Sequence, residues 1–568
     1  MPADSPDKRL RNGTLSDHSF ALTLAVPFLL LFLVTQAGTM SPAHDSMCYL
    51  RMIERGEFFH EHHLLYNAAA WLWMEFWQLL VPSLGAITLI SWLNGLFGAL
   101  TLSVFALLLV RRAGIGRTPA AVATLLPAFS FGIWFYSITI EVYIIALFFV
   151  LAAMYVLTRN QLDARTVIFA AMLHGVAMLF HQLHLFFLFP ALYIIMQSRR
   201  RENGSAHPAW RLALLYTATA GLTALLPYLF IGWYVLGMNT PERYLHWLIG
   251  YGARGDFWNA PGLSLLPKIV LGYGRSLVGA DFLFALQPTL EMIERLLPSK
   301  WLADQEFVVR RLPEWLAAAL VALSVAFTAL FVAALGKGLV AARRLRSQLP
   351  SVFHSALVFL LTYSVFFTFW DTTNVEFWIP QSVMVWMLLA IVLTLNKSSR
   401  SSTPRTKPSA PVLVVLLAGL LFVLNGAGSI LWMIPTSNDY YMSKSRDLAS
   451  LAGDNGLILL PDHYMMDWYL PVESNRRTRT FTRALKDCDR DAACALERLT
   501  RSMDSASARG GRIVLDGQLV HPSSAVVIRG GTGYPELMEA FLERFSRNLD
   551  EREAATGPIY VIEGSHSR

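Results

Sequence analysis

The sequence predicts a polytopic α-helical membrane protein with about eleven transmembrane helices, followed by a C-terminal α/β domain outside the membrane. Of the 568 residues, 54% are hydrophobic and only 15% are charged, and the mean hydropathy is +0.44. A chain of this composition cannot cover itself with polar surface, so lipid must solvate much of it. The basic residues also gather in short clusters between apolar runs, as in loops on the cytoplasmic side of a membrane.

The net charge of +7 does not indicate a nucleic-acid partner. The basic residues lie between apolar runs rather than along one water-facing surface, so we predict that the chain binds no nucleic acid. Its three cysteines, Cys48, Cys488 and Cys494, are too few for a disulfide framework or a Cys-rich zinc fold. A membrane topology explains the charge pattern best.

The first span is predicted at residues 20–38, after a short cytoplasmic tail, 1–19. Lys8, Arg9 and Arg11 precede the apolar run and place the tail inside. The run is longer than the apolar core of a cleaved signal peptide, and no A-x-A site follows it. We therefore expect this segment to be retained as a transmembrane helix.

The next segment, 39–85, is predicted to be extracytoplasmic. It contains a Trp-rich helix, 71–80, of the kind that lies in the membrane interface. The following span, 86–110, ends at Arg111 and Arg112, which returns the chain to the cytoplasm.

The other spans continue this alternation within a transmembrane domain of residues 20–434. A span inside the long segment 237–314 would put Lys337 and Arg343 outside, so we expect that segment to be extracytoplasmic. A linker with Arg400, Arg405 and Lys407 should lie inside. The remaining spans are predicted at 119–136, 140–157, 167–180, 183–196, 212–236, 315–335, 352–369, 377–395 and 412–433.

Residues 435–568 are predicted to form the extracytoplasmic α/β domain. Strand-like runs at 457–460, 512–515 and 559–562 alternate with helical patterns such as 534–547. Cys488 and Cys494 could pair in an oxidising compartment, but on one continuous helix they would face different sides. The sequence leaves this disulfide open.

Asp45 is the first candidate catalytic residue. It follows the first span closely, so its carboxylate should lie near the outer membrane surface, where it could accept a proton from an attacking hydroxyl group. A structural role is the alternative, because Asp45 precedes a helical pattern at 47–55 and aspartate is a preferred N-cap. The residues alone favour the cap.

Basic side chains near the same surface are candidate phosphate ligands. Arg51 and Arg55 are four residues apart and would share a helix face, where they could hold a phosphate or pair with neighbouring glutamates. Lys268 and Arg275 are further external or interfacial candidates.

Histidines form two further groups of candidates. The run His60-Glu61-His62-His63 matches no zinc motif, so we predict no metal site and no other cofactor. His174, His181 and His184 lie in apolar segments and must face a partner or a cavity. Hydrogen bonding in the core explains them as well as ligand contact does.

Three segments stand out together: GEFFHEHH at 56–63, FGIWFYSITIEVY at 131–143 and GVAMLFH at 175–181, with Asp45 just beyond the first span. In this combination they resemble the GT-C superfamily of polyprenyl-phosphate-sugar glycosyltransferases, and most closely its protein-O-mannosyltransferase-like branch. The likeness covers about residues 20–190, the loop 371–380 and the overall topology.

The resemblance implies roles for individual residues. It makes Asp45 the catalytic base, which reverses the preference for a helix N-cap. It makes Glu141 the donor-site or helper carboxylate at the second external tip. His62 or His63 falls where the branch usually has His-Pro-Pro, but Leu64 follows here. Ser46 stands where the family often has a second acidic residue, which argues against a metal-binding pair.

The implied reaction moves a sugar from a polyprenyl phosphate to an acceptor hydroxyl at the outer face of the cytoplasmic (inner) membrane. The partners would be the lipid-linked sugar, membrane lipid and a glycan, lipid or protein acceptor. A transporter would also explain buried histidines and carboxylates, but it predicts internal repeats, and none is visible. A non-catalytic cell-envelope assembly protein would keep the fold without needing Asp45.

Overall fold

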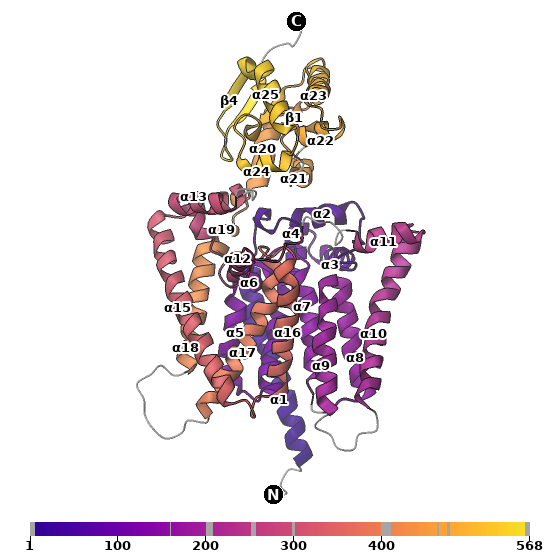
Figure 1. Cartoon of the computed structure of the whole chain (residues 1–568), viewed down its shortest axis with the longest axis vertical. Coiled ribbons are helices and arrows are strands. Elements are labelled where there is room, and N and C mark those ends of the chain that lie inside the picture. Colours follow the sequence, from indigo (N-terminus) through magenta and orange to yellow (C-terminus); the bar gives the residue numbers. More distant parts are fainter. Residues whose placement is uncertain are drawn as a thin grey trace. The chain divides into compact units, whose positions relative to one another are not determined.

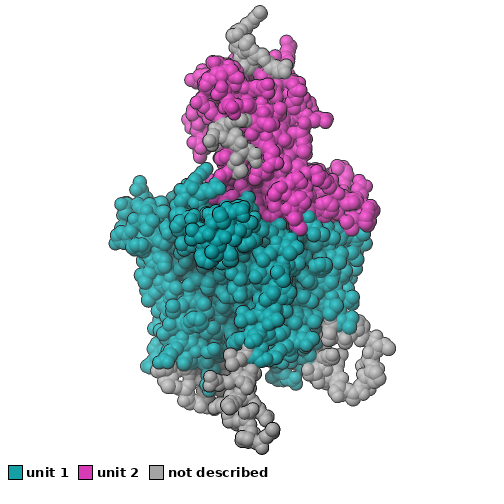
Figure 2. All heavy atoms as spheres, turned by 180° about the vertical axis from the view of Figure 1, so that it is seen from behind, with its two compact units in different colours: residues 1–36, 52–280, 319–431 teal, residues 37–51, 281–318, 432–568 magenta. Residues whose placement is uncertain are grey.

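The structure is a computed structural model that describes residues 6–159, 161–199, 208–250, 257–297, 302–398, 410–462, 465–473 and 477–562. Arg400, Arg405 and Lys407 of the predicted inner linker lie outside these residues. The chain forms two compact units (Figure 2). Unit 1 comprises residues 1–36, 52–280 and 319–431, and unit 2 comprises residues 37–51, 281–318 and 432–568.

Long apolar helices dominate unit 1 (Figure 1). Seven helices among the described residues are long and apolar enough to cross a membrane, or eight if the bent pair α5 and α6 is one span. On α10, Leu222, Leu226 and Leu229 form an exposed stripe, as expected where a helix faces lipid. The long helices are α1 (Pro6–Val34), α4 (Ala86–Leu107), α10 (Ala209–Phe230), α15 (Glu314–Arg344), α16 (Ser351–Phe369), α17 (Ile379–Ser398) and α18 (Ala410–Asn425).

Three shorter apolar helices complete the set. They are α7 (Tyr143–Leu157), α8 (Ala164–Phe180) and α9 (Leu188–Arg199), the last preceded by the 3₁₀ turn η3 (Gln182–Phe187). Each apolar run expected to span the membrane is therefore helical, and the prediction of a multi-pass helical protein is confirmed. The number of helices that cross the bilayer stays a prediction.

Helix α5 (Arg117–Phe129) bends by 69° into α6 (Phe131–Ile138). Asn425 at the end of α18 holds this break: its Nδ2 donates to the carbonyls of Phe129 and Leu277, and its Oδ1 accepts from the amide of Gly279. These bonds fix the end of α12 (Leu265–Leu277) beside the break. Residues 119–136 were predicted as a single span, and the break at Ser130 was not expected.

Several shorter helices connect the apolar ones. Trp-rich α3 (Tyr66–Leu80) contains the helix predicted for the membrane interface, and α2 (Ser46–Glu54) precedes it. Within the described part of 237–314, no helix has the length and hydropathy of a span. The helices there are α11 (Pro241–Ile249), α12, α13 (Gln287–Leu296) and α14 (Ala303–Val309).

The C-terminal part of unit 2 is built on a five-stranded sheet in the order β2-β1-β3-β5-β4. Strand β1 (Leu457–Leu460) is parallel to β2 (Arg477–Thr480) and β3 (Ile513–Asp516), whereas β5 (Ile559–Ile562) is antiparallel to β3 and β4 (Leu549–Arg552). The predicted strands are β1, β3 and β5. The sequence did not reveal β2 and β4 because they are edge strands, whose charged side chains break the apolar pattern.

Helices cover both faces of this sheet. One face packs into a core with Phe481, Leu499 and Phe541, and α20 contacts β1 and β3. The predicted helix 534–547 is α25, which ends at Phe545. The helices are α20 (Tyr440–Ala452), α21 (Met466–Glu473), α22 (Phe481–Lys486), α23 (Ala492–Ser507), α24 (Ser524–Gly530) and α25 (Tyr534–Phe545).

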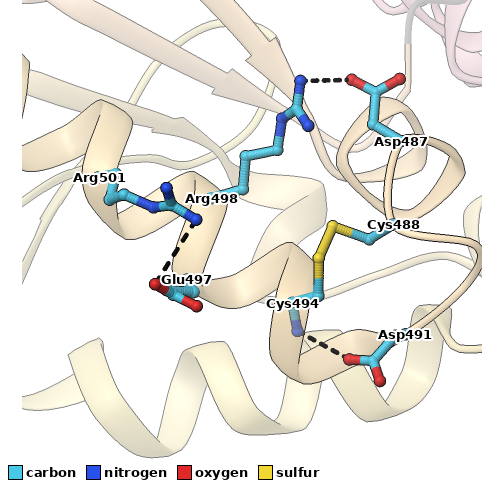
Figure 3. The surroundings of a disulfide bond; sticks show 7 residues. All are labelled: Asp487, Cys488, Asp491, Cys494, Glu497, Arg498 and Arg501. Carbon is cyan, nitrogen blue, oxygen red and sulfur yellow. Dashed lines mark hydrogen bonds and ion pairs between the residues drawn. A yellow bond between two sulfur atoms is a disulfide. The ribbon is translucent and has the colours of Figure 1, made fainter.

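Cys488 and Cys494 form a disulfide, with Cα atoms 5.9 Å apart (Figure 3). The chain turns between α22 and α23, where Asp489 and Arg490 have φ of 47° and 69°. The cysteines therefore do not share one continuous helix, which removes the geometric objection to their pairing.

Candidate active site

Asp45 belongs to unit 2, between the 3₁₀ turn η1 (Ser41–Ala43) and α2. Its carbonyl accepts the amide of Tyr49 at 2.9 Å, so Asp45 stands where an N-cap would stand. Its side chain is exposed. An exposed carboxylate at this place can meet an acceptor from the water side, so the position suits either role.

Asp439 anchors the segment that carries Asp45. Its buried carboxylate accepts from the amides of Met40 and Ser41, at 2.7 and 3.1 Å, and from the Ser41 hydroxyl. It also caps α20 by accepting from the amide of Met442. Burial raises the pKa of Asp439, and these hydrogen bonds oppose the rise. Asp439 was not among the residues predicted from the sequence, although an aspartate before a helical pattern signals an N-cap.

His44 adds a second link within unit 2. Its Nε2 lies 3.2 Å from Oδ2 of Asp304, a buried residue of α14. His44 itself has a φ of 42°, in the left-handed region that non-glycine residues rarely adopt. The residue next to Asp45 thus combines an unusual backbone conformation with a contact to a buried carboxylate.

Arg51 and Arg55 differ in their surroundings. Nε of Arg51 donates to the carbonyl of Trp468 in α21 at 3.1 Å, within unit 2. Helix α2 ends at Glu54, so Arg55 is exposed just beyond it and belongs to unit 1. The helix therefore stops one residue before Arg55, and the expectation that both arginines share one helix face stays a prediction.

Glu141 lies in unit 1, in the turn between α6 and α7. Its side chain is only 2% exposed. Asn94 of α4 fixes the turn, since its Nδ2 donates to the carbonyls of Thr139 and Glu141, each at 2.7 Å. A buried carboxylate at a helix break marks a functional candidate in a membrane protein.

Glu376 lies near the same turn and was not singled out as a site residue from the sequence. Its carboxylate accepts from the hydroxyls of Tyr136 and Tyr143, at 2.7 and 2.9 Å, and from Nδ2 of Asn374 at 2.6 Å. Tyr136 interacts electrostatically with both Glu376 and Glu141. We call Tyr136, Tyr143, Asn374 and Glu376 the Glu376 cluster.

Helix α12 carries two basic side chains, and one of them, Arg275, lies near this cluster. Arg275 interacts electrostatically with Tyr136, and Nζ of Lys268 donates to Oδ1 of Asn259 at 2.6 Å. The two residues are seven apart and half-buried, so they share one face of α12. Gly272 between them lets the helix approach the loop, because a Cβ there would lie 2.2 Å from the carbonyl oxygen of Thr372.

The loop that carries His60, His62 and His63 packs on the end of α8. Nδ1 of His62 lies 3.3 Å from Oε1 of Gln182, and the rings of His60 and His63 stack at 4.2 Å. Burial first, and then the neighbouring His60, His181 and His62, lower the pKa of His63 well below its usual value, which favours the neutral form of this imidazole. Within the described ranges, no group of three His, Cys, Asp or Glu side chains could hold a metal ion.

His181 and His184 have different surroundings. The ring of His181 lies 4.9 Å from that of Tyr143, next to the Glu376 cluster. His184 is 1% exposed, and its Nδ1 lies 2.9 Å from the hydroxyl of Tyr363, while its carbonyl is 2.8 Å from Nε2 of His174. These bonds favour the core role for His184.

Unit 1 therefore gathers Glu141, His181 and Arg275 around the Glu376 cluster, whereas Asp45 and Arg51 belong to unit 2.

Neither a protein-family model nor a curated protein matches the chain. Two solved structures of ArnT from Cupriavidus metallidurans resemble it, one bound to undecaprenyl phosphate (10% identity, TM-score 0.50) and one in the apo state (11% identity, TM-score 0.53). Each match covers 96% of this chain and 98% of the other.

The chain has a GT-C-like fold. An oligosaccharyltransferase from Archaeoglobus fulgidus, in complex with Zn and sulfate, is also similar, with 12% identity and a TM-score of 0.47 over 94% of this chain and 72% of that one. The GT-C-like assignment rests on the ArnT structures, which match over nearly the full length of both chains. It confirms the fold expected from the resemblance, and the protein-O-mannosyltransferase-like branch stays a prediction.

Proposed function

We propose that this GT-C-like protein is a glycosyltransferase that moves a sugar from a polyprenyl-phosphate donor to an acceptor hydroxyl. The observation that carries the proposal is the full-length likeness in fold to ArnT, of which one structure holds undecaprenyl phosphate. Fold alone does not specify a reaction. The buried Glu141, the Glu376 cluster and the basic face of α12 supply polar groups suited to a phosphate and a sugar, and they favour an enzyme over an assembly protein.

In the proposed reaction, Asp45 removes the proton of the acceptor hydroxyl, and the resulting oxygen attacks the anomeric carbon. The bond from that carbon to the phosphate oxygen breaks, and the lipid phosphate leaves. Lys268 and Arg275 stabilise the charge that develops on this phosphate. Glu141 and His181 position the donor sugar, with Glu376 holding Tyr136 and Tyr143 beside them.

The other candidates take supporting roles in this proposal. His62 and His63 form the acceptor side, as in the protein-O-mannosyltransferase-like branch, and Arg55 can contact a lipid phosphate from its exposed position. Arg51 and His184 already bond to Trp468 and Tyr363, which favours structural roles for both. A glycan, a lipid or a protein carries the accepting hydroxyl.

The donor can be tested with purified protein. We expect transfer of a radiolabelled sugar from a polyprenyl-phosphate carrier, because the basic face of α12 suits a phosphate held at the membrane. A matched reaction supplies the same sugar as a soluble nucleotide sugar without lipid. Efficient transfer from the nucleotide sugar alone would contradict the proposal, and transport of substrate without any transfer would favour the rival transporter.

We also propose that the C-terminal domain lies outside the cytoplasmic membrane. The disulfide between Cys488 and Cys494 supports this, since disulfides persist in oxidising compartments. In a Cys48→Ser background, a maleimide-polyethylene glycol reagent should label the denatured chain only after reduction, and then at two sites. Labelling of both cysteines without reduction, in chain taken directly from cells, would place the domain in a reducing compartment.

A further inference from the structure

A pocket of about 370 Å³ lies in the C-terminal domain, beside the disulfide. Its wall is strongly basic. Five arginines line it: Arg477, Arg479, Arg498, Arg501 and Arg509.

Two elements of the sheet domain place these arginines together. Arg477 and Arg479 are two apart on the edge strand β2, so both point to the same face of the sheet. Arg498 and Arg501 are three apart on α23, and Arg509 lies two residues past its end and eight after Arg501, so the three continue one side of the helix. Because β2 and α23 are separate in sequence, the basic wall appears only on folding.

Acidic side chains balance only part of this charge. Asp487 is the one acidic residue among the described residues lining the pocket, and it lies 3.0 Å from Arg498. Arg501 lies 3.5 Å from Glu497, but both side chains are about 70% exposed, so the pair contributes little stability. Figure 3 shows the two arginines turned toward these separate carboxylates.

This excess of positive charge has no structural explanation in the domain. All five arginines are exposed, so solvent screens part of their mutual repulsion, but like charges gathered around one concavity still repel one another. The Arg498–Asp487 pair serves to close the turn between α22 and α23. Nη1 of Arg479 donates to the carbonyl of Thr478 at 2.9 Å and Nη1 of Arg509 to the hydroxyl of Ser505 at 2.6 Å, so these two arginines bond to neutral oxygens that leave their charge unbalanced.

We propose that this pocket binds a molecule or lipid headgroup that carries two or more phosphate groups. The guanidinium fork matches phosphate oxygens in pairs of hydrogen bonds, and several forks from two walls suit more than one phosphate. The volume is within the range of small-molecule sites. None of the described residues lining the pocket is aromatic, so no stacking surface for a nucleobase is present there.

This inference goes beyond the proposed transferase activity and does not depend on it. All the arginines involved belong to the C-terminal domain, and none is assigned a part in sugar transfer. A binding measurement can therefore succeed or fail whether or not the chain transfers a sugar.

The probe is inorganic pyrophosphate, titrated calorimetrically into the full chain in detergent at low salt. Arg477→Gln/Arg479→Gln should weaken binding about tenfold or more, since each lost charged hydrogen bond is worth about one such factor. Arg501→Gln/Arg509→Gln tests the helix wall in the same way. The control, Arg544→Gln/Arg547→Gln, removes the same charge from exposed positions outside the pocket and should leave the affinity within about twofold.

An equal loss of affinity in the control variant would overturn the proposal, because binding would then follow net charge alone. Absence of pyrophosphate binding by the unmodified chain would overturn it too. A competition experiment in nanodiscs shows whether the phosphates belong to a lipid headgroup or to a water-soluble molecule. Diacylglycerol pyrophosphate, a lipid with two phosphate groups, should compete with pyrophosphate if the ligand is a lipid headgroup, and should leave binding unchanged, relative to phosphatidylcholine alone, if the ligand is water-soluble.

Discussion

Asp45→Asn is expected to lower the rate of sugar transfer about 10²–10⁴-fold, the usual cost of losing a general base. Asparagine has nearly the shape of aspartate and caps helices about as well, so α2 should keep its N-terminus beside Tyr49. The exposed side chain contributes little to packing. The variant should therefore express and bind the lipid donor normally, and single-turnover transfer from a labelled polyprenyl-phosphate sugar measures the loss.

Asp45→Ala separates the two roles of this residue. It removes both the proton acceptor and the capping group, and any stability that it loses beyond Asp45→Asn, roughly 0.5–2 kcal/mol for a real cap, reports the structural role. Transfer by Asp45→Asn at close to the unmodified rate would show that Asp45 is only a cap.

Lys444→Met is expected to destabilise the C-terminal domain by about 3–5 kcal/mol, the cost of leaving one charge of a buried pair without its partner. Nζ of Lys444 on α20 lies 2.7 Å from Oδ2 of Asp516 at the end of β3, and each side chain is only 5% exposed. Nζ also donates to the hydroxyl of Tyr440 at 3.0 Å. Pulse proteolysis of the full chain across a urea gradient should show the lower midpoint.

The control for this pair is the double variant Lys444→Met/Asp516→Asn. An asparagine oxygen can still accept from the amide of Gln518, as Oδ1 of Asp516 does at 2.9 Å, but no charge is left buried. Most of the lost stability should return. A single variant Lys444→Met with an unchanged midpoint would show that the pair is not buried in solution.

The pH dependence of this pair follows from the pKa of Lys444. Burial alone would lower that pKa, but attraction to Asp516 and Tyr440 outweighs burial and raises it above the usual value. Because the pKa of Lys444 is higher in the folded chain than in the unfolded chain, the pair stabilises the fold fully at pH values below the unfolded pKa of about 10.4. That stabilisation is lost only as the pH rises through the pKa of the folded chain. The difference in unfolding free energy between Lys444→Met and the unmodified chain should therefore stay constant from about pH 6 to 9.

The sequence by itself determined the class of protein and the order of its parts. Apolar runs such as 86–110 and 352–369 are too long and too apolar for helices that face water. Their length and composition therefore sufficed to predict membrane helices. The buried strands β1 and β5 were equally clear, because apolar runs of four residues mark strands covered on both faces. The same local patterns drew attention to Asp45, Glu141 and the histidines.

Only the tertiary structure decided which of these residues meet. Glu376 reaches Tyr136 across 240 positions of sequence, and Asp439 holds Ser41 across 398. The edge strand β2 and helix α23 bring their arginines to one pocket for the same reason. Contacts between residues so far apart in sequence depend on how whole helices and strands pack. The spacing of apolar residues, every 2 residues in a strand or 3.6 in a helix, predicts only local structure.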